Sequence, residues 1–179
     1  DNRIPKDGTI IEVAPGYETK IGDALSLLDF HGTLILIEPD PAAAVSIERA
    51  YKRILPRATV RVVEKTLDKI KIGTDVPLHV DALAANHPFD DMALAAAMHG
   101  NPQAFFSAER QSGETVSRDV QKIYDGVSDR DYTQGILETI TAWQDFIQEL
   151  KPARFMASQY PSRKLELKGL ARRQKSGYI

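Results

Sequence analysis

The chain has 179 residues, 42% of them hydrophobic, and a net charge of −2. A chain of this length can bury a sizeable core, so we expect a single domain over residues 1–179. It contains no cysteine, which excludes a disulfide framework, a zinc–cysteine site and a thiol nucleophile. The small net charge gives no general attraction for polyanions. No apolar stretch approaches the roughly 18 residues of a membrane span, and we expect a cytoplasmic protein.

The first apolar run, Thr9–Val13, is followed at once by Ala14, Pro15 and Gly16. Aliphatic and β-branched residues followed by proline and glycine predict a strand that ends in a loop. Apolar residues then recur at helical spacing, at Ile21, Ala24, Leu25 and Leu28. The first turn of this helix would direct backbone N–H groups at the loop, so the order strand, glycine loop and helix indicates a nucleotide site.

Strands and helices alternate through most of the remaining chain. The expected strands are Thr33–Ile37, 59–64, 78–85 and Phe155–Ser158. One expected helix begins at Pro41 and ends before Pro56, a short one covers 92–98, and a third carries an apolar stripe at Ile136, Ile140, Trp143, Ile147 and Leu150. Residues 101–131 lack a clear period and are expected to form an insertion or a lid. The alternation predicts an α/β fold with a three-layer, doubly wound, mostly parallel sheet.

Glu38 stands directly after the second expected strand, a little over twenty residues beyond Gly16. A carboxylate at this place can accept hydrogen bonds from both ribose hydroxyls of an adenosine. The alternative is that Glu38 caps the helix that begins near Pro41. Taken together with the glycine loop, Glu38 favours a nucleoside ligand.

Several stretches resemble, in chain order, the motifs of the class I S-adenosylmethionine-dependent methyltransferases. Residues 11–16 (Ile-Glu-Val-Ala-Pro-Gly) resemble the first motif, and residues 36–40 (Leu-Ile-Glu-Pro-Asp) resemble the second. Residues 80–89 resemble the fourth strand and motif of the amino-methylating branch, and Lys151 and Pro152 also look like the family. The resemblance covers most of the chain from Thr9 to Ser158.

The resemblance implies a Rossmann-like enzyme that transfers a methyl group from S-adenosylmethionine to an unidentified acceptor, a small molecule or a nucleic-acid amine or hydroxyl. Glu12 would orient the methionine end of the cofactor, and Glu38 would hold its ribose. Position alone places Lys65 and Thr66 near the adenine. The cofactor-binding residues expected in this way are Glu12, Ala14, Pro15, Gly16, Tyr17, Glu38, Pro39, Thr66 and Asn86.

By similarity to the amino-methylating branch, the catalytic residues are expected to be Asn86, His87 and Phe89. Asn86 and the carbonyl near His87 would accept hydrogen bonds from a target amine, while Phe89 packs against its ring. Alignment of the amine lone pair with the S–CH₃ bond would then supply most of the catalysis. His87 stands where the branch has its first proline. It would either accept a proton from the acceptor or only close the turn by hydrogen bonding.

Tyr17 and Glu18 stand where the family has later glycines. This departure keeps two alternatives open, a non-catalytic binding module on the same fold and an NAD(P)-dependent oxidoreductase. No metal site is expected, because Asp90 and Asp91, which could join His87, are typical helix N-terminal residues. The other histidines, His31, His79 and His99, are interpreted as turn or surface residues.

The C-terminal segment, residues 162–175, is the one clear block of positive charge. It indicates either a solvated tail or a contact with nucleic acid. One further strand candidate lies around residues 165–170, so the last edge of the sheet is expected to be short. The acceptor and the oligomeric state do not follow from the sequence.

Overall fold

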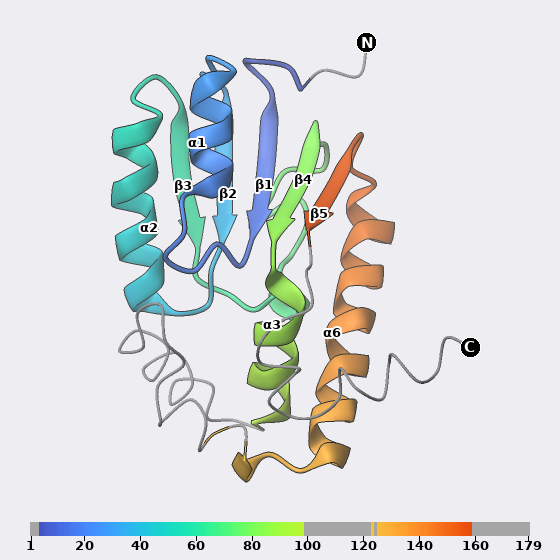
Figure 1. Ribbon diagram of the computed structural model, residues 1–179. Coiled ribbons are helices and arrows are strands. Elements are labelled where there is room, and N and C mark those ends of the chain that lie inside the picture. The colour runs from blue at the N-terminus through green and yellow to red at the C-terminus, as the bar shows by residue number, and fades with distance from the viewer. Residues whose placement is uncertain (1–3, 99–122, 124, 159–179) are drawn as a thin grey trace, which may run out of the picture. The chain divides into compact units, whose positions relative to one another are not determined.

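The structure is a computed structural model, which describes residues 4–98, 123 and 125–158 (Figure 1). Its strands are β1 (Thr9–Val13), β2 (Thr33–Ile37), β3 (Thr59–Val63), β4 (Ala82–Asn86) and β5 (Phe155–Ser158). Its helices are α1 (Lys20–Leu27), α2 (Pro41–Ile54), the short 3₁₀ helix η1 (Leu67–Lys69), α3 (Pro88–Ala97) and α6 (Asp129–Leu150). No helix among these described residues is long and apolar enough to cross a membrane.

The chain divides into two compact units, Asp1–Pro88 with Ala142–Ser158 and Phe89–Thr141 with Gln159–Ile179. The first unit contains the whole sheet, and the second contains α3 beyond its first residue and the first part of α6. The expectation of a single domain over residues 1–179 stays a prediction.

The five strands form one sheet in the order β3-β2-β1-β4-β5, and every neighbouring pair is parallel. This order confirms the predicted α/β fold with a parallel sheet. From β1 the chain first extends the sheet through β2 to β3, and it then returns to add β4 and β5 on the other side of β1. The direction therefore reverses between β1 and β4, and open sheets of this kind bind ligands beyond the carboxyl ends of the strands at such a reversal.

Both faces of the central strands are buried. On one face, α1 packs against β4 and α2, and α2 packs against β3 (Figure 1). The core of this face includes Ile10, Leu34, Leu36, Leu25 and Ile47. On the opposite face, the side chains of Ile11, Ile35 and Leu83 are at most 1% exposed. Burial on both sides is what continuous apolar strands in a parallel sheet require, and it agrees with the predicted three layers.

The structure matches the expected bounds of β1, β2, α2 and β5, and β3 ends one residue early. The expected start of the fourth strand at residue 78 is wrong, because β4 begins at Ala82. Leu78 is 63% exposed, and strand pairing begins only where Ala82 meets Ile10. Just before that pair, the side chain of Asp81 accepts a hydrogen bond from the backbone N–H of Thr9 (2.8 Å).

Helix α3 begins at Pro88 rather than at residue 92, since proline suits the first turn of a helix, where its missing N–H has no partner to lose. Helix α6 begins at Asp129, so the last three residues of the expected lid are helical. Most of that lid, residues 101–122 and 124, lies outside the described residues. So do the basic segment 162–175, the strand candidate 165–170 and His99.

The buried stripe of α6 is displaced from the one expected from its apolar spacing. Ile140, which belongs to the apolar stripe of the sequence, is 42% exposed. Ile136 and Ile147 are only partly buried. The buried positions are Tyr132, Gly135, Thr139, Trp143, Phe146 and Leu150. Trp143 lies in the core, 3% exposed, with its ring centroid 5.7 Å from that of Phe155 on β5.

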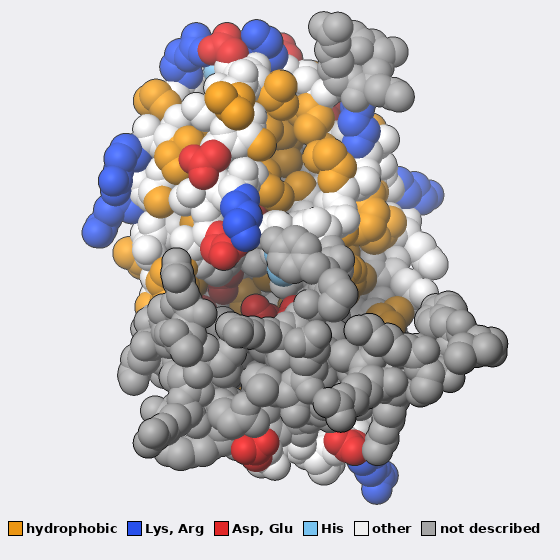
Figure 2. Space-filling view, viewed as in Figure 1, with side chains coloured by type: hydrophobic (Ala, Val, Ile, Leu, Met, Phe, Trp, Pro, Cys, Tyr) orange, Lys and Arg blue, Asp and Glu red, His pale blue; other side chains and the backbone are white. Residues whose placement is uncertain are grey.

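Charged side chains of both signs are mixed on one face of the molecule. On the face shown in Figure 2, the described Lys and Arg side chains and Asp and Glu side chains are scattered among hydrophobic and uncharged ones. This mixture agrees with the net charge of −2.

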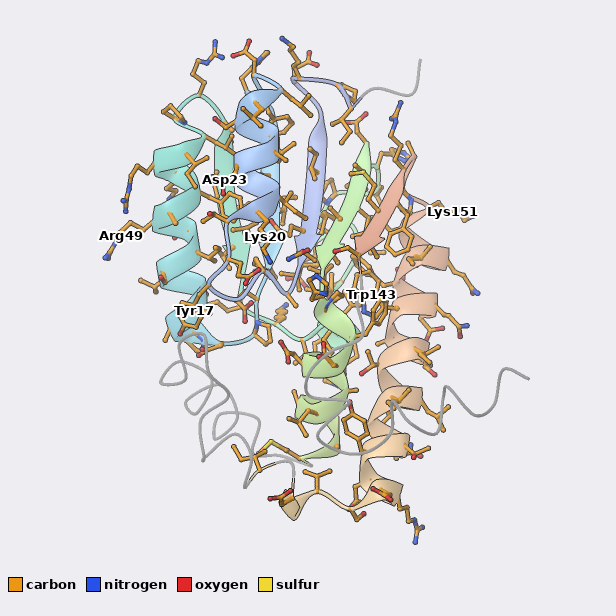
Figure 3. All side chains as sticks on the ribbon, viewed as in Figure 1. Tyr17, Lys20, Asp23, Arg49, Trp143 and Lys151 are labelled. Atoms are coloured by element: carbon orange, nitrogen blue, oxygen red, sulfur yellow. The ribbon has the colours of Figure 1, made fainter. Side chains whose placement is uncertain are left out.

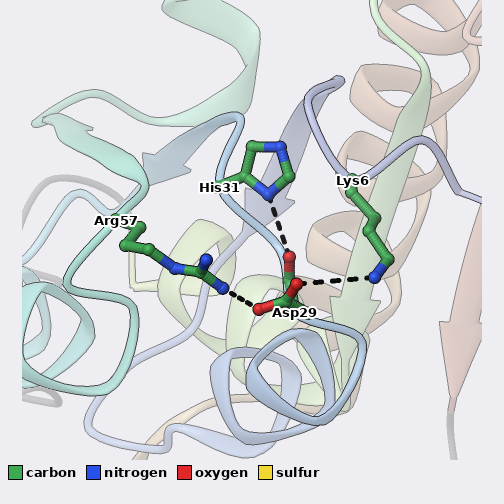
Figure 4. Close-up of polar contacts among 4 residues, drawn as sticks. All are labelled: Lys6, Asp29, His31 and Arg57. Atoms are coloured by element: carbon green, nitrogen blue, oxygen red, sulfur yellow. Dashed lines mark hydrogen bonds and ion pairs between the residues drawn. The ribbon is translucent and has the colours of Figure 1, made fainter.

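Charged residues at the amino ends of the first three strands form an exposed cluster (Figure 4). Asp29 pairs with Lys6 (3.5 Å) and with Arg57, and its backbone carbonyl contacts Nδ1 of His31 (3.0 Å). Lys6 precedes β1, His31 precedes β2 and Arg57 precedes β3, so the cluster joins the segments that lead into them. His31 is exposed, as predicted for a surface or turn residue. Exposed pairs of this kind contribute little to stability, roughly 0–1 kcal/mol each.

Candidate functional site

The loop after β1 contains two residues in the left-handed backbone region. Ala14 has φ 52° and Gly16 has φ 58°. Glycine adopts this conformation without steric cost, whereas a side chain makes it about 1–2 kcal/mol less favourable. A Cβ added at Gly16 would meet nothing within 4 Å, so the conformation rather than crowding favours glycine here. The loop therefore leaves open space beside Gly16, at the carboxyl end of β1.

The carboxylate of Glu38 joins this loop to the turn that follows β2. Its Oε2 accepts a hydrogen bond from the N–H of Gly16 and its Oε1 accepts one from the N–H of Asp40, both at 2.9 Å. Burial raises the pKa of Glu38, while these two N–H donors act in the opposite direction. The two stretches predicted to bind the cofactor are thus brought into direct contact.

Asp40, rather than Glu38, is the N-cap of α2. Its Oδ1 accepts a hydrogen bond from the N–H of Ala42 (3.2 Å), and Pro41 occupies the first helical turn. The alternative that Glu38 caps this helix is therefore wrong. A capping carboxylate two residues later leaves Glu38 to contact the loop after β1.

The chemistry of Glu38 fits a ribose, and its access is narrow. A carboxylate oxygen has two lone pairs, and each oxygen of Glu38 uses one of them for a backbone N–H. The remaining lone pairs can accept hydrogen bonds from two vicinal hydroxyls. Glu38 is only 3% exposed, so a ribose has a narrow approach to its two oxygens.

Glu12 on β1 is 1% exposed, and its carboxylate is engaged inside the protein. The hydroxyl of Tyr51 on α2 donates a hydrogen bond to Oε2 of Glu12 at 2.5 Å. Burial raises the pKa of Glu12 to about 8, with the Tyr51 hydrogen bond opposing the rise and the nearby charge of Glu38 adding to it. The expected role of Glu12 at the methionine end of the cofactor stays a prediction.

Tyr51 was not among the residues predicted for the site. Its hydroxyl also accepts a hydrogen bond from the N–H of Gly22 in the first turn of α1 (3.1 Å). Burial and the neighbouring Glu12 both raise its pKa. Its position four residues after Ile47 was the one signal in the sequence, because this spacing places Tyr51 on the face of α2 that packs against the sheet.

Three other expected cofactor residues lie at the carboxyl end of the sheet. Tyr17 is 45% exposed and its hydroxyl lies 3.3 Å from Oδ2 of Asp40, beside the start of α2 (Figure 3). Pro39 is partly buried in the turn before α2, and Thr66 is exposed at the start of η1. Lys65, expected near the adenine, is paired with Asp75 (2.7 Å). The roles of these side chains toward a cofactor stay predictions.

Asn86 ends β4 and uses both ends of its side-chain amide. Its Oδ1 accepts a hydrogen bond from the hydroxyl of Ser158 (2.8 Å), and its Nδ2 donates one to Glu18 (3.3 Å). Glu18 is also paired with Lys20 (2.6 Å). Ser158 and Glu18 were missed by the sequence reasoning about an acceptor. The parallel register that places Asn86 beside Ser158 depends on strand order, which the motif alone does not give.

His87 adopts a left-handed backbone conformation, with φ 56°, and its N–H donates to the carbonyl of Ser158 (2.9 Å). This contact fixes the turn between β4 and α3. Phe89 is the first residue of the second unit, and its expected packing against a substrate ring stays a prediction. Among the described residues, no three His, Asp or Glu side chains are arranged to hold a metal ion.

No family model matches the sequence, and no curated protein is significantly similar to it. Similar solved structures include a putative methyltransferase from Thermoplasma acidophilum, with 18% identity and a TM-score of 0.38 over 53% of this chain and 40% of that one. The chain thus spans less than half the length of that protein.

Two further similar structures cover more of the chain. Geranyl diphosphate C-methyltransferase from Streptomyces coelicolor A3(2), solved with Mg²⁺, geranyl diphosphate and S-adenosyl-L-homocysteine, has 12% identity and a TM-score of 0.42 over 96% of this chain and 71% of that one. The cyclopropane synthase MmaA2 from Mycobacterium tuberculosis has 10% identity and a TM-score of 0.37 over 94% and 69%. At these identities and TM-scores, the likeness says nothing about ligand or activity.

Proposed function

We propose that the protein binds S-adenosylmethionine at the carboxyl edge of β1 and β2 and transfers its methyl group to an acceptor yet to be identified. The observation that carries the proposal is the contact between Glu38 and the N–H of Gly16 (2.9 Å). It joins an acidic residue suited to a ribose with a glycine loop that has open space beside it. The pair lies next to the reversal in strand order, where such sheets bind ligands.

The bound cofactor supplies a methyl group on a positively charged sulfur, and the protein contributes binding and orientation. Glu38 would accept the ribose hydroxyls, and the open side of Gly16 would receive the part of the cofactor next to the ribose. The acceptor would lie beside Asn86, at the end of β4. The bond from the acceptor nitrogen or oxygen to the methyl carbon would form as the S–CH₃ bond breaks, S-adenosylhomocysteine would leave, and the acceptor's proton would pass to solvent. The protein's part would be to align the acceptor with the S–CH₃ bond.

Calorimetric titration with S-adenosylmethionine and S-adenosylhomocysteine tests the proposal, with NAD as the competing nucleotide. We expect micromolar binding of both sulfur compounds and none of NAD. Glu38→Ala should abolish binding. Glu48→Ala is the matched control, because Glu48 lies on the outer face of α2 and pairs with the exposed Lys52 (2.8 Å).

Well-folded protein that binds neither sulfur compound would contradict the proposal, and tight binding of NAD alone would favour the oxidoreductase. Once binding is established, methyl transfer to small amines, hydroxyl compounds and mixed RNA at low salt identifies the acceptor class. Loss of RNA binding with rising salt would point to contacts from the basic residues of the chain.

A non-catalytic binding module is the second candidate, and the hydrogen bonds of Asn86 favour it. Both ends of its amide are engaged, by Ser158 and Glu18, which leaves it less free to receive a substrate amine. Cofactor binding without methyl transfer to any acceptor class would support this candidate. Transfer that is lost in Asn86→Ala with unchanged cofactor affinity would exclude it.

A further inference from the structure

The loop after β1 is held at both ends by one buried hydroxyl. Glu12 lies in β1, just before the loop, and Gly22 lies in the first turn of α1, just after it. The hydroxyl of Tyr51 donates to Glu12 (2.5 Å) and accepts from the N–H of Gly22 (3.1 Å). We call these two hydrogen bonds the Tyr51 bridge.

Helix α1 lacks the usual side-chain cap, and the Tyr51 bridge supplies one. The hydroxyl of the N-cap residue Thr19 bonds to Asp23 (2.9 Å), and its side chain caps no backbone N–H of the helix. The first N–H groups of a helix have no partner within the helix. Gly22 is buried, so without the hydroxyl of Tyr51 its N–H would lose its acceptor away from water.

The sequence is adapted to the Tyr51 bridge at Gly22. A Cβ at this position would lie 2.0 Å from Cε1 of the Tyr51 ring. Only glycine leaves room for the ring to reach Glu12. Tyr51 itself is fully buried, so its place is set by packing as well as by its two hydrogen bonds.

From these contacts we infer that Tyr51 is a positioning residue for cofactor binding: it fixes both ends of the loop that carries Gly16, and so presets that loop for the ligand. The inference rests on the proposed function for its ligand. Tyr51 does not touch the open space beside Gly16, and it acts through the loop. A preset loop loses less conformational entropy on binding, so affinity should fall when the bridge is removed.

Tyr51→Phe tests the inference, because it keeps the packed ring and removes only the hydroxyl. We expect amide hydrogen exchange at Gly22 and in the loop to become at least about fivefold faster, since the Gly22 N–H loses its acceptor. The affinity for S-adenosylhomocysteine should fall by about five- to tenfold. Ile47→Val is the matched control, because Ile47 is buried in the same helix and contributes no hydrogen bond to the loop. It should lower the urea midpoint while leaving loop exchange and affinity as in the wild type.

Wild-type exchange at Gly22 in Tyr51→Phe would overturn the bridge, and faster exchange with unchanged affinity would overturn its role in binding. If Ile47→Val lost as much affinity as Tyr51→Phe, general destabilisation would explain the loss, and the role of Tyr51 in binding would also be overturned. If the wild-type protein binds neither sulfur compound, the proposed function fails and the affinity claim fails with it. The exchange measurement needs no ligand, so it still decides whether Tyr51 holds the loop.

Discussion

Two buried carboxylates at the carboxyl edge of the sheet differ in the donors that reach them. Glu38 accepts two backbone N–H groups, whereas Glu12 accepts the hydroxyl of Tyr51. Hydrogen bonds donated to a carboxylate favour its ionised form, whereas burial favours its neutral form. For Glu12 burial dominates and raises its pKa to about 8.

The raised pKa of Glu12 predicts that stability falls as the pH rises. In the unfolded chain this carboxyl group titrates near its ordinary value of 4.5, and in the folded protein near 8. Between these values the folded state binds the extra proton, so its stabilising effect is present below pH 4.5 and is lost as the pH rises toward 8. The slope contributed by this group is at most about 1.4 kcal/mol per pH unit.

Urea unfolding of the wild type and Glu12→Gln from pH 5 to pH 8 measures this contribution. The neutral amide cannot titrate, so the variant should lose less stability than the wild type over this range. Glu48→Gln, on the outer face of α2, should follow the wild type. Tyr51 and Glu38 are the ionisable groups that act on Glu12, and both are unchanged in these variants. Parallel curves for wild type and Glu12→Gln would contradict the raised pKa.

At the scale of elements, the close packing of α3 and α6 depends on Gly135. A Cβ at this position would lie 2.2 Å from the carbonyl oxygen of Ala93 and 2.9 Å from the N of Ala97. Both neighbours are backbone atoms of α3, which cannot move aside as a flexible side chain can. Gly135→Ala should therefore lower the free energy of unfolding by about 1–3 kcal/mol, although alanine is the better helix former.

Gly126→Ala provides the control for the α3–α6 prediction. A Cβ added at Gly126 would meet nothing within 4 Å, so this variant should be neutral or slightly stabilised. Urea denaturation of both variants makes the comparison. If Gly135→Ala were as stable as Gly126→Ala, the two helices would not pack as closely as the structure shows.

The sequence predicted the elements whose pattern is local. Continuous apolar runs such as β2 can be recognised because both of their faces are buried. In α6 the buried face includes Gly135 and not Ile140. A glycine that packs against a neighbouring backbone has no apolar side chain, so the hydrophobic pattern could not reveal this face. The start of β4 also escaped prediction, since Leu78 is as apolar as the strand and only pairing with β1 separates them.

Prediction of the site was uneven for the same reason. The sequence assigned Glu38 and Gly16 to one ligand site after neighbouring strands, but it did not predict the hydrogen bond between them. The contact between Tyr51 and Glu12 could not be predicted, because an apolar helix face does not reveal which hydroxyl meets which carboxylate across the core. Contacts that depend on strand register and helix rotation require the folded chain.

At the scale of the whole molecule, α6 contributes buried residues to both units as one uninterrupted helix. Tyr132, Gly135 and Thr139 belong to the second unit, while Trp143, Phe146 and Leu150 belong to the first. We expect a helix that carries buried residues in both units to couple their unfolding. Trp143, the sole tryptophan, reports on the first unit, whereas far-ultraviolet circular dichroism reports on helices of both.

We therefore expect thermal unfolding followed by these two probes to give coincident transitions. Leu94→Ala should shift both, because Leu94 is fully buried in the second unit and its truncation costs about 2–5 kcal/mol. Leu137→Ala, at a position that is 54% exposed in α6, should leave both nearly unchanged. If Leu94→Ala left the midpoint of the Trp143 fluorescence transition unchanged, the two units would unfold separately.

The anchors of the loop after β1 have a consequence for the order in which the chain becomes structured during synthesis. Glu38 follows Gly16 by 22 residues, and Tyr51 follows Glu12 by 39. When the nascent chain has emerged from the ribosome only as far as α1, neither the carboxylate of Glu38 nor the hydroxyl of Tyr51 is available to hold the loop. Once α2 has emerged, β1, β2 and both anchors are complete, before β4 has emerged. The loop after β1 thus belongs to the half of the sheet that can form first, since nascent chains fold from their N-terminal end.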